Sequence, residues 1–315
     1  MTPDVRAVQA RLAAWYAAVA RPLPWRDADT TPWGVLVSEI MLQQTPAARV
    51  EGPWRDWMTV WPTPAHLAAA PVADVLRAWG RLGYPRRALR LRDAAQAIVD
   101  LHDGRVPDDE AALLALPGVG RYTAAAVRAF AFGRRSVVLD VNVRRVLARL
   151  AAGVEHPPTH ESAAERAAAE DWVPHDDADA ATWSAAAMEL GAVVCTARAP
   201  LCDACPVADS CAWLAAGRPA WSGPPRVAQA WEGTDRQCRG RIMAALRASD
   251  RPVPLADVAW PDVSQLRRAA TGLVADGLAV EHPAGLALPR HGSPRLSSCV
   301  ATLAGSGTGS PSMAR

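Results

Sequence analysis

The sequence contains no lysine, because all 34 of its Lys and Arg positions are arginine. A covalent mechanism that needs a lysine Schiff base is therefore excluded. No window approaches the roughly 18 consecutive apolar residues of a membrane span, and no basic, apolar leader follows Met1. These absences predict a cytoplasmic protein without a membrane segment.

The composition is otherwise that of a soluble globular protein. Hydrophobic residues make up 50% and charged residues 21% of the 315 positions, which argues against a disordered chain and against a collagen-like repeat. At about 100–200 residues per domain, this length predicts about two domains.

The net charge of +2 hides an uneven distribution of charge along the chain. Residues 1–150 hold 20 Arg against 14 Asp and Glu, residues 151–190 hold 1 against 9, and residues 191–315 hold 13 against 9. Arginines also cluster between Arg81 and Arg92. This pattern favours a polyanion such as DNA as a partner of the first half. A solvated helix face is the alternative interpretation.

Apolar residues recur at three- and four-residue steps through the first 215 residues, and Pro and Gly separate the segments. The first 215 residues are therefore predicted to be all-α. The predicted helices cover residues 4–20, 33–45, 47–61, 65–70, 72–82, 86–102, 108–116, 121–132 and 141–151.

A Gly-, Pro- and Ser-rich stretch at residues 216–225 indicates a linker, and a smaller α+β unit is expected after it. Its predicted elements are helices near 236–248, 254–260 and 263–276 and a hairpin formed by residues 278–280 and 286–288. Three helices followed by a two-stranded wing predict a winged-helix-like unit. The last residues, 291–315, are rich in Ser, Gly and Pro and are predicted to be a disordered tail.

Four of the six cysteines lie close together in the sequence, with the spacing Cys195-x6-Cys202-x2-Cys205-x5-Cys211. Four thiolates in one short loop can bind a [4Fe–4S] cluster or a tetrahedral zinc ion. Zinc sites usually combine two C-x2-C-like pairs, whereas this loop has one, so the spacing favours the cluster. Cys238 and Cys299 have no role that the sequence assigns.

The segment Leu116–Gly120 separates two predicted helices and reads Leu-Pro-Gly-Val-Gly. This pattern is typical of a helix–hairpin–helix, whose glycines leave backbone N–H groups of Gly118, Val119 and Gly120 free to contact a DNA phosphate. Such a contact positions DNA without reading its sequence. A purely structural turn between two core helices is the alternative.

Two acidic residues lie in apolar surroundings. Glu39 is part of an otherwise apolar helix start, and Asp140 ends the run Val137–Leu139 immediately before a predicted helix. Burial raises the pKa of a carboxyl group, whereas donors at a helix N-terminus keep one ionised. The pair is therefore expected to supply one neutral acid and one anion, although Asp140 can also serve simply as the N-cap of its helix.

These motifs, in this order, resemble the helix–hairpin–helix DNA glycosylases. The segments are "SEIMLQQT" around Glu39, "RLGY" ending at Tyr84, "LPGVGRYTA", "LDVNVRRVL" and the 6-2-5 cysteine loop. They are most similar to the adenine DNA glycosylases of the MutY family, over about residues 20–215. The resemblance implies a six-helix barrel beside a cluster domain, with double-stranded DNA lying across the cleft between them.

This resemblance and the linker composition together predict the domain organisation of the chain. An N-terminal helix at 1–24 is expected to pack with the cluster domain at 136–216, and the barrel with its helix–hairpin–helix covers 25–135. The remaining segments are a linker at 217–231, the winged-helix-like unit at 232–290 and the tail at 291–315.

The resemblance also implies a reaction and roles for four residues. Glu39 corresponds to the acid that protonates adenine N7, and Asp140 to the carboxylate that stabilises the oxocarbenium-like sugar and the incoming water. Asn142 matches a polar residue near the sugar. Tyr122 stands where lyase-type relatives carry the Schiff-base lysine, which implies a monofunctional glycosylase.

The same resemblance assigns DNA contacts. Gln44 and Tyr84 match intercalating positions beside the base opposite the adenine, with Thr45 and Leu82 close by. Gln43 and Arg26 match residues that line the adenine pocket. The implied substrate is DNA with adenine opposite 8-oxoguanine or guanine, bound by a monomer associated with the nucleoid.

Two departures from the family pattern stand out. Pro85 follows Tyr84 where the family usually has a second aromatic residue. The C-terminal unit is too short for the Nudix-like domain that helps the family to read 8-oxoguanine. Arg267 and Arg268, on the expected recognition helix of the winged-helix-like unit, are candidates for DNA contact, with packing or protein binding as the alternative.

Two other functions compete with this interpretation. A monofunctional thymine or uracil mismatch glycosylase would share the barrel, the cluster, Asp140 and Tyr122, but it has no need of an acid at Glu39. A non-enzymatic iron–sulfur DNA-binding regulator would release no base at all.

Overall fold

The computed structural model describes residues 4–224 and 231–290 and is almost entirely helical over those ranges. The first nine helices match the sequence-predicted segments within a few residues at each end. They are α1 (Val5–Val19), α2 (Pro32–Leu42), α3 (Ala47–Val60), α4 (Pro64–Ala69), α5 (Val72–Trp79), α6 (Arg86–Leu101), α7 (Glu110–Ala115), α8 (Arg121–Phe132) and α9 (Val141–Leu150).

The later elements up to residue 215 were expected only as unspecified short helices. They are α10 (Ala163–Glu170), α11 (Asp177–Val193) and α12 (Ala212–Ala215), with short 3-10 turns at Cys202–Ala204 and Ala208–Ser210. A further 3-10 turn, Pro24–Arg26, lies between α1 and α2. The long helix α11 is rich in alanine and begins at the N-cap Asp176, whose side chain accepts from two backbone N–H groups.

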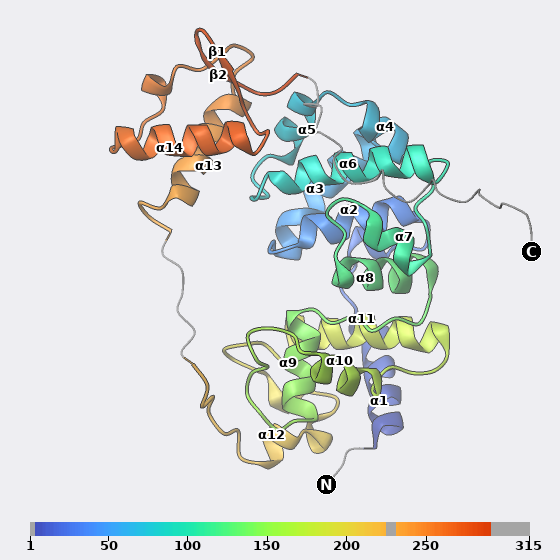
Figure 1. Cartoon of the computed structure of the whole chain (residues 1–315). Helices are drawn as coiled ribbons and strands as arrows, with labels where there is room; N and C mark the ends of the chain where they lie inside the picture. The colour runs from blue at the N-terminus through green and yellow to red at the C-terminus, as the bar shows by residue number, and fades with distance from the viewer. Residues whose placement is uncertain (1–3, 225–230, 291–315) are drawn as a thin grey trace, which may run out of the picture.

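Helices α2 to α8 form one body, in which α2 is the central element (Figure 1). Residues 33–41 of α2 are all buried, as expected for a helix that is apolar on every side. Tryptophans fill much of this core, and Trp57 contacts both Trp61 and Trp79 edge-to-face at centroid distances of 4.5 and 5.6 Å. Every potential active-site group on α2 is therefore held in a rigid, water-poor setting.

The second body combines the N-terminal helix with later parts of the chain (Figure 1). Side chains of α1, α9 and α11 share one apolar core, which includes Val8, Leu12 and Leu190. Helix α11 also contacts α8 of the first body, so the two bodies meet along α8 and α11.

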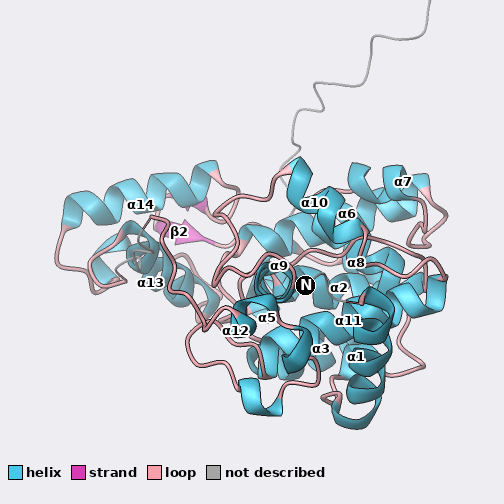
Figure 2. Ribbon diagram, turned by 90° about the horizontal axis from the view of Figure 1, so that it is seen from below, coloured by secondary structure: helices cyan, strands magenta, loops and turns pink. Residues whose placement is uncertain are grey.

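The C-terminal unit consists of α13 (Asp235–Arg247), a 3-10 turn at Leu255–Asp257, α14 (Val263–Ala275) and the strands β1 (Val280–His282) and β2 (Gly285–Ala287). Within the described residues these are the only two strands, as Figure 2 shows. They pair antiparallel, and an isolated bridge joins Val253 to Leu286. This arrangement matches the winged-helix-like order of elements, but the prediction of a helix near 254–260 is wrong, since only the 3-10 turn Leu255–Asp257 forms there.

The predicted strands were misplaced by up to two residues. Sequence analysis expected strands at residues 278–280 and 286–288, joined through residues 282–285. In the structure Val280 pairs with Ala287, and only Pro283 and Ala284 connect the strands. Leu278 and Ala279 are instead buried in the core between α14 and the hairpin. The apolar residues of this segment correctly indicated burial, but they did not determine which residues pair in the hairpin.

The C-terminal unit packs on the first body rather than on the second. Its buried residues Cys238, Ile242 and Leu273 belong to the same apolar cluster as the α2–α8 core. Ion pairs Arg77–Asp250 (3.0 Å) and Arg86–Asp276 (3.2 Å) connect the two. The domain boundaries stay a prediction, and the expected tail with Cys299 lies outside the described residues.

No helix in the described ranges has the length and apolar character needed to cross a membrane.

Candidate active site

Glu39 is a buried acid in the middle of α2, with 4% of its surface exposed. Its Oε2 atom has no hydrogen-bond partner among the described residues. Burial raises the pKa of this carboxyl to about 7, and the nearby Asp140 charge adds to the effect, while a hydrogen bond from Tyr122 and the charge of Arg26 oppose it. Glu39 can therefore carry a proton near neutral pH.

Tyr122, in the first turn of α8, lies near both acids. It hydrogen-bonds Glu39, and its own pKa lies well above the usual value because of burial and the charges of Glu39 and Asp140. The phenol thus stays protonated and acts as a donor. Of the groups that sequence analysis assigned to catalysis, Asp140 thus lies close enough to Glu39 and Tyr122 for its charge to raise the pKa of both.

Asp140 is the N-cap of α9 and holds its carboxylate with three donors. Its Oδ1 accepts from the backbone N–H groups of Asn142 (2.9 Å) and Val143 (2.7 Å), and its Oδ2 accepts from Asn142 Nδ2 (2.7 Å). Its pKa is nevertheless raised, since burial outweighs these donors and Arg145. The N-cap role and a catalytic role are compatible, because the donors orient both oxygens.

A continuous chain of hydrogen bonds leads from Asp140 to the cysteine loop. Asn142 Oδ1 accepts from Arg145 Nη2 (2.9 Å), which also donates to the Gly191 carbonyl (2.6 Å), while Arg145 Nε donates to the Cys195 carbonyl (2.8 Å). A Cβ on Gly191 would lie 2.7 Å from Asn142 Cβ. Glycine is therefore required where α11 passes α9.

Arg26 lies near Glu39 but is paired elsewhere. Its Nη2 donates to Glu189 Oε2 at 2.9 Å, and Arg21 binds the same carboxylate through Nε at 2.6 Å. Glu189 is fully buried in α11, and its pKa is lowered by these two arginines despite burial. Sequence analysis missed Glu189, although an acid between Met188 and Leu190 gave the same signal as Glu39.

The helix–hairpin–helix consists of α7, the turn Leu116–Gly120 and α8. Gly118 has a φ of +81°, and a Cβ there would lie 2.8 Å from Arg90 Cβ, so only glycine fits. The N-cap of α8 is Gly120, which supplies no side-chain acceptor to the first turn. The N–H groups at the start of α8 are thus available to an anion. The Val119 N–H, which sequence analysis expected to be free, instead donates to the Leu116 carbonyl at 3.1 Å.

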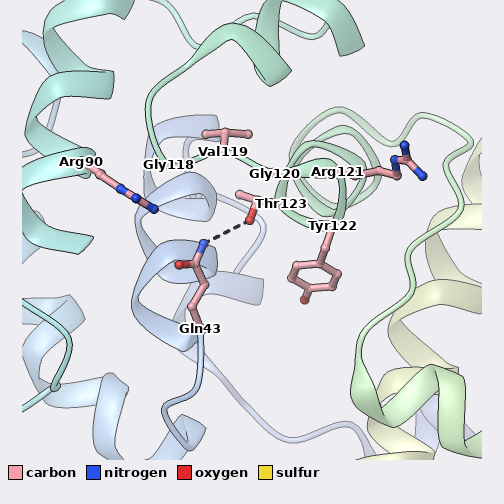
Figure 3. A pocket seen from close by; sticks show the side chains of 8 residues that line it. All are labelled: Gln43, Arg90, Gly118, Val119, Gly120, Arg121, Tyr122 and Thr123. Carbon is pink, nitrogen blue, oxygen red and sulfur yellow. Dashed lines mark hydrogen bonds between the residues drawn. The ribbon is translucent and has the colours of Figure 1, made fainter. Parts of the chain in front are cut away.

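A pocket of about 580 Å³ opens beside this turn, and Arg90, Arg121, Val119 and Gln43 contribute to its wall. Figure 3 shows Gln43 facing Thr123, to which its Nε2 donates at 3.3 Å, with Tyr122 pointing away toward the second body. Gln43 thus lies where the anion-binding turn and the acid-bearing helices meet. Glu39 and Asp140 do not line this pocket.

Four non-glycine residues in the described part of the chain have a positive φ, and two of them are Gln44 (57°) and Tyr84 (46°). These are the two positions that the resemblance assigns to intercalation. Backbone strain at a binding residue persists only where the surroundings enforce it.

Arg87 enforces both strained conformations. This buried guanidinium donates to the carbonyls of Ile40, Met41 and Gln43 on one side and of Leu82 and Gly83 on the other. Burial lowers its pKa to about 10, which leaves it charged at neutral pH. Sequence analysis did not separate Arg87 from the neighbouring arginines.

The remaining predicted DNA contacts differ in exposure. Tyr84 is 40% exposed, whereas Leu82 is 4% exposed and belongs to the apolar core. Thr45 is also buried, and its Oγ1 donates to the Leu82 carbonyl (3.1 Å) and accepts from Arg87 (3.0 Å). In this conformation the buried Thr45 and Leu82 stabilise the loop that carries Tyr84, and only the Tyr84 side chain is exposed for contact with DNA.

The cysteine loop fits a thiolate-bound cluster. Cys195, Cys202, Cys205 and Cys211 are all partly buried and reduced, and they lie close enough for each other's charge to raise the pKa of the Cys205 thiol, which burial brings to about 11. The buried Arg149 donates to Cys195 Sγ at 3.3 Å, which favours a thiolate there. Within the described ranges, no three His, Cys, Asp or Glu side chains converge on a single metal ion.

Comparison with known proteins identifies relatives for most of the chain. A family model for the HhH-GPD superfamily of base excision DNA repair proteins matches residues 37–174, and one for the iron–sulfur binding domain of endonuclease III matches residues 195–211. The second match spans the four cysteines, and it supports the expected [4Fe–4S] cluster in this part of the chain. The chain is 51% identical to the adenine DNA glycosylase of Mycobacterium tuberculosis (strain H37Rv) over 285 residues, 89% of this chain and 93% of that protein.

Two solved structures share the fold of the first two bodies. A thermostable thymine-DNA glycosylase has a TM-score of 0.59 and 25% identity and covers 67% of this chain and 97% of its own. Endonuclease III, in a trapped covalent intermediate with DNA, has a TM-score of 0.57 and 23% identity and covers 67% of this chain and 95% of its own. These results confirm the predicted helix–hairpin–helix glycosylase fold.

The first prediction concerns Arg87. Arg87→Met is expected to leave several buried carbonyls without a donor and to lower the free energy of unfolding by about 2–4 kcal/mol in urea. Tryptic cleavage after Arg81 is expected to become at least about tenfold faster, since the loop then opens locally. Arg105→Met, at an exposed arginine, is the control. Equal cleavage rates in both variants would contradict the positioning role.

The second prediction concerns the stability of the buried acid. Because the pKa of Glu39 is raised from 4.5 to about 7, wild-type stability is full below pH 4.5 and is lost as the pH rises through 7. Glu39→Gln is expected to stabilise the chain by roughly 3 kcal/mol at pH 8 and by little at pH 5. Urea unfolding at both pH values measures this, with the exposed Glu232→Gln as control. A gain that does not depend on pH would contradict the burial argument.

Proposed function

Since this chain belongs to the adenine DNA glycosylases of the helix–hairpin–helix superfamily, we propose that it hydrolyses the N-glycosidic bond of adenine mispaired with 8-oxoguanine or guanine, without lyase chemistry. The observation that carries the proposal is the buried Glu39 carboxyl, whose Oε2 has no hydrogen-bond partner and whose pKa is about 7. The pKa suits a general acid at neutral pH.

Glu39 supplies the proton. Adenine leaves poorly as an anion, so transfer of the Glu39 proton to N7 lets the C1′–N9 bond break with its electron pair going to a neutral base. Tyr122 keeps its own proton because of its raised pKa, and it orients Glu39 through their hydrogen bond. Arg26, which acts on Glu39 through its charge, is held in place by Glu189.

Asp140 stabilises the sugar. Positive charge develops at C1′ as the bond breaks, and an adjacent carboxylate in a water-poor site offsets it. The Asn142 contacts hold this carboxylate at the start of α9. Water then adds its hydroxide to C1′, and its remaining proton restores the acid. The products are free adenine and an abasic sugar.

The amine-free composition supports the absence of a lyase step. A β-elimination through a Schiff base needs a nucleophilic amine, and no side chain of the sequence supplies one. Tyr122 occupies the first turn of α8 instead. The thymine or uracil mismatch alternative has no use for the Glu39 acid, and a regulator without enzymatic activity has no use for either acid.

The DNA contacts follow from the same geometry. The N–H groups of Gly118 and Gly120 suit a phosphate of the adenine-bearing strand, whereas the Val119 N–H donates to the Leu116 carbonyl. Adenine must leave the base stack to reach Glu39, which costs about a few kcal/mol. The exposed Tyr84 ring, beside Gln44, is suited to fill the gap that the adenine leaves. We further propose that the protein acts as a monomer on chromosomal DNA in the cytoplasm.

Cys195, Cys202, Cys205 and Cys211 would hold the [4Fe–4S] cluster, and such binding would fix their loop. Hydrolysis transfers no electron, so the contribution of a bound cluster would be structural. It would keep the Cys195 carbonyl in position for Arg145, which in turn holds Asn142 beside Asp140.

The third prediction tests the reaction with defined duplexes. Adenine opposite 8-oxoguanine or guanine is expected to be released, and the strand to break only after alkali. Thymine opposite guanine is expected to stay intact. Glu39→Gln, the control for contaminating activity, is expected to be slower by at least about 10². Breakage only at thymine would overturn the adenine assignment, and breakage without alkali would overturn the monofunctional one.

A further inference from the structure

A second groove lies where the C-terminal unit meets the first body. It has a volume of about 960 Å³ and lies between residues 80–86 and α13. Helix α13 contacts α5, and Arg86, at the start of α6, pairs with Asp276, which follows α14; Figure 1 shows the C-terminal unit on this side of the first body. This groove is separate from Glu39 and Asp140, and no step of the hydrolysis uses it.

The lining of this groove is strongly basic. Seven arginines line it, and no Asp or Glu is among its described lining residues. The arginines come from three segments and are Arg49, Arg81, Arg86, Arg236, Arg239, Arg241 and Arg247. An uncompensated charge of this size in one concave surface attracts a polyanion.

Most of these arginines lack a protein counterion. Asp276 pairs with Arg86 and Arg239. In the described part of the chain, none of the other five forms an ion pair with a carboxylate. Arg247 is half-buried, and its pKa is lowered by burial and by the charge of Arg81. Like charges held together in this way indicate a site that an external anion completes.

Aromatic rings accompany the arginines. The Arg236 guanidinium lies over Tyr84 at 4.8 Å and over Trp231 at 5.1 Å. Both rings are exposed, Tyr84 by 40% and Trp231 by 50%. A basic groove with exposed aromatic surfaces is the combination that nucleic-acid strands bind.

The groove continues the proposed active-site surface. Gln43 lines the helix–hairpin–helix pocket and Gln44 lines this groove, so consecutive residues join the two. Because Gln44 and Tyr84 face the base opposite the adenine in the proposed function, the strand next to this groove is the opposite one.

We propose that the groove between residues 80–86 and α13 binds the phosphodiester backbone of the DNA strand opposite the adenine. This inference rests on the proposed function for the identity of the strand. It gives the C-terminal unit a role in DNA binding through α13. The exposed Arg267 and Arg268 of α14, the residues suggested by sequence analysis, do not line the groove.

The shared C-terminal unit is consistent with this role. Residues up to 231 make up less than three quarters of the chain, so a match over 89% with the mycobacterial adenine DNA glycosylase must include part of this unit. The thymine-DNA glycosylase and endonuclease III structures each cover 67% of the chain.

The fourth prediction compares two double variants of the full chain that remove the same charge. Arg236→Ala/Arg241→Ala alters the groove, and Arg267→Ala/Arg268→Ala alters α14. All four residues are exposed helix positions, where alanine is well tolerated. The probe is a duplex with a tetrahydrofuran abasic analogue opposite 8-oxoguanine, and anisotropy gives Kd between 50 and 200 mM salt.

The groove variant is expected to bind at least about tenfold more weakly, and the slope of log K against log salt is expected to fall by about 2, close to one per lost phosphate contact. The α14 variant is expected to match the wild type. Groove-variant binding within twofold of the wild type, or an equal loss in both variants, would overturn the proposal.

A second probe identifies the strand. Uncharged methylphosphonate linkages beside 8-oxoguanine are expected to weaken the wild type but not the groove variant, whereas the same linkages in the other strand weaken both. The reverse pattern would overturn the strand assignment. Since these readouts measure binding, a failure to release adenine would reject the proposed function separately.

Discussion

The site depends on a carboxyl group that is kept away from water and from any second hydrogen-bond partner. Glu39 lies on the most deeply buried helix of the first body, and its Oε2 is unpaired. An unpaired buried polar atom lowers stability, and the same burial lets the group hold a proton near pH 7. The apolar character of α2, the donor Tyr122 and the Arg26–Glu189 pair all follow from this need to keep one acid neutral and oriented.

In this chain without lysine, buried arginines connect segments of the fold through hydrogen bonds. Arg87 joins two strained loops, Arg145 links Asn142 to the cysteine loop, and Arg149 donates to the Thr196 and Ala197 carbonyls as well as to Cys195 Sγ. A guanidinium offers five donors in a planar fork, whereas an ammonium is a strongly hydrated point charge. These connections between segments need the planar group, and a nearby amine would also introduce a competing nucleophile.

Much of the fold was accessible from the sequence because short amphipathic helices with Pro and Gly boundaries carry a strong periodic signal. The acids Glu39 and Asp140 were also accessible, since a charge within an apolar run is rarely accidental. Arg87 was not, because an arginine-rich helix gives no local sign of which guanidinium turns inward. The prediction of the hairpin register was wrong for a related reason. Leu278 and Ala279 are apolar because they are buried in the core, not because they belong to a strand.

The most direct test of the central claim is the pH dependence of adenine release under single-turnover conditions with saturating enzyme. If protonated Glu39 is the acid, the rate is expected to be constant below about pH 6 and to fall close to tenfold per pH unit above about pH 7. A rate that stays constant to pH 9, or that rises with pH, would contradict the account.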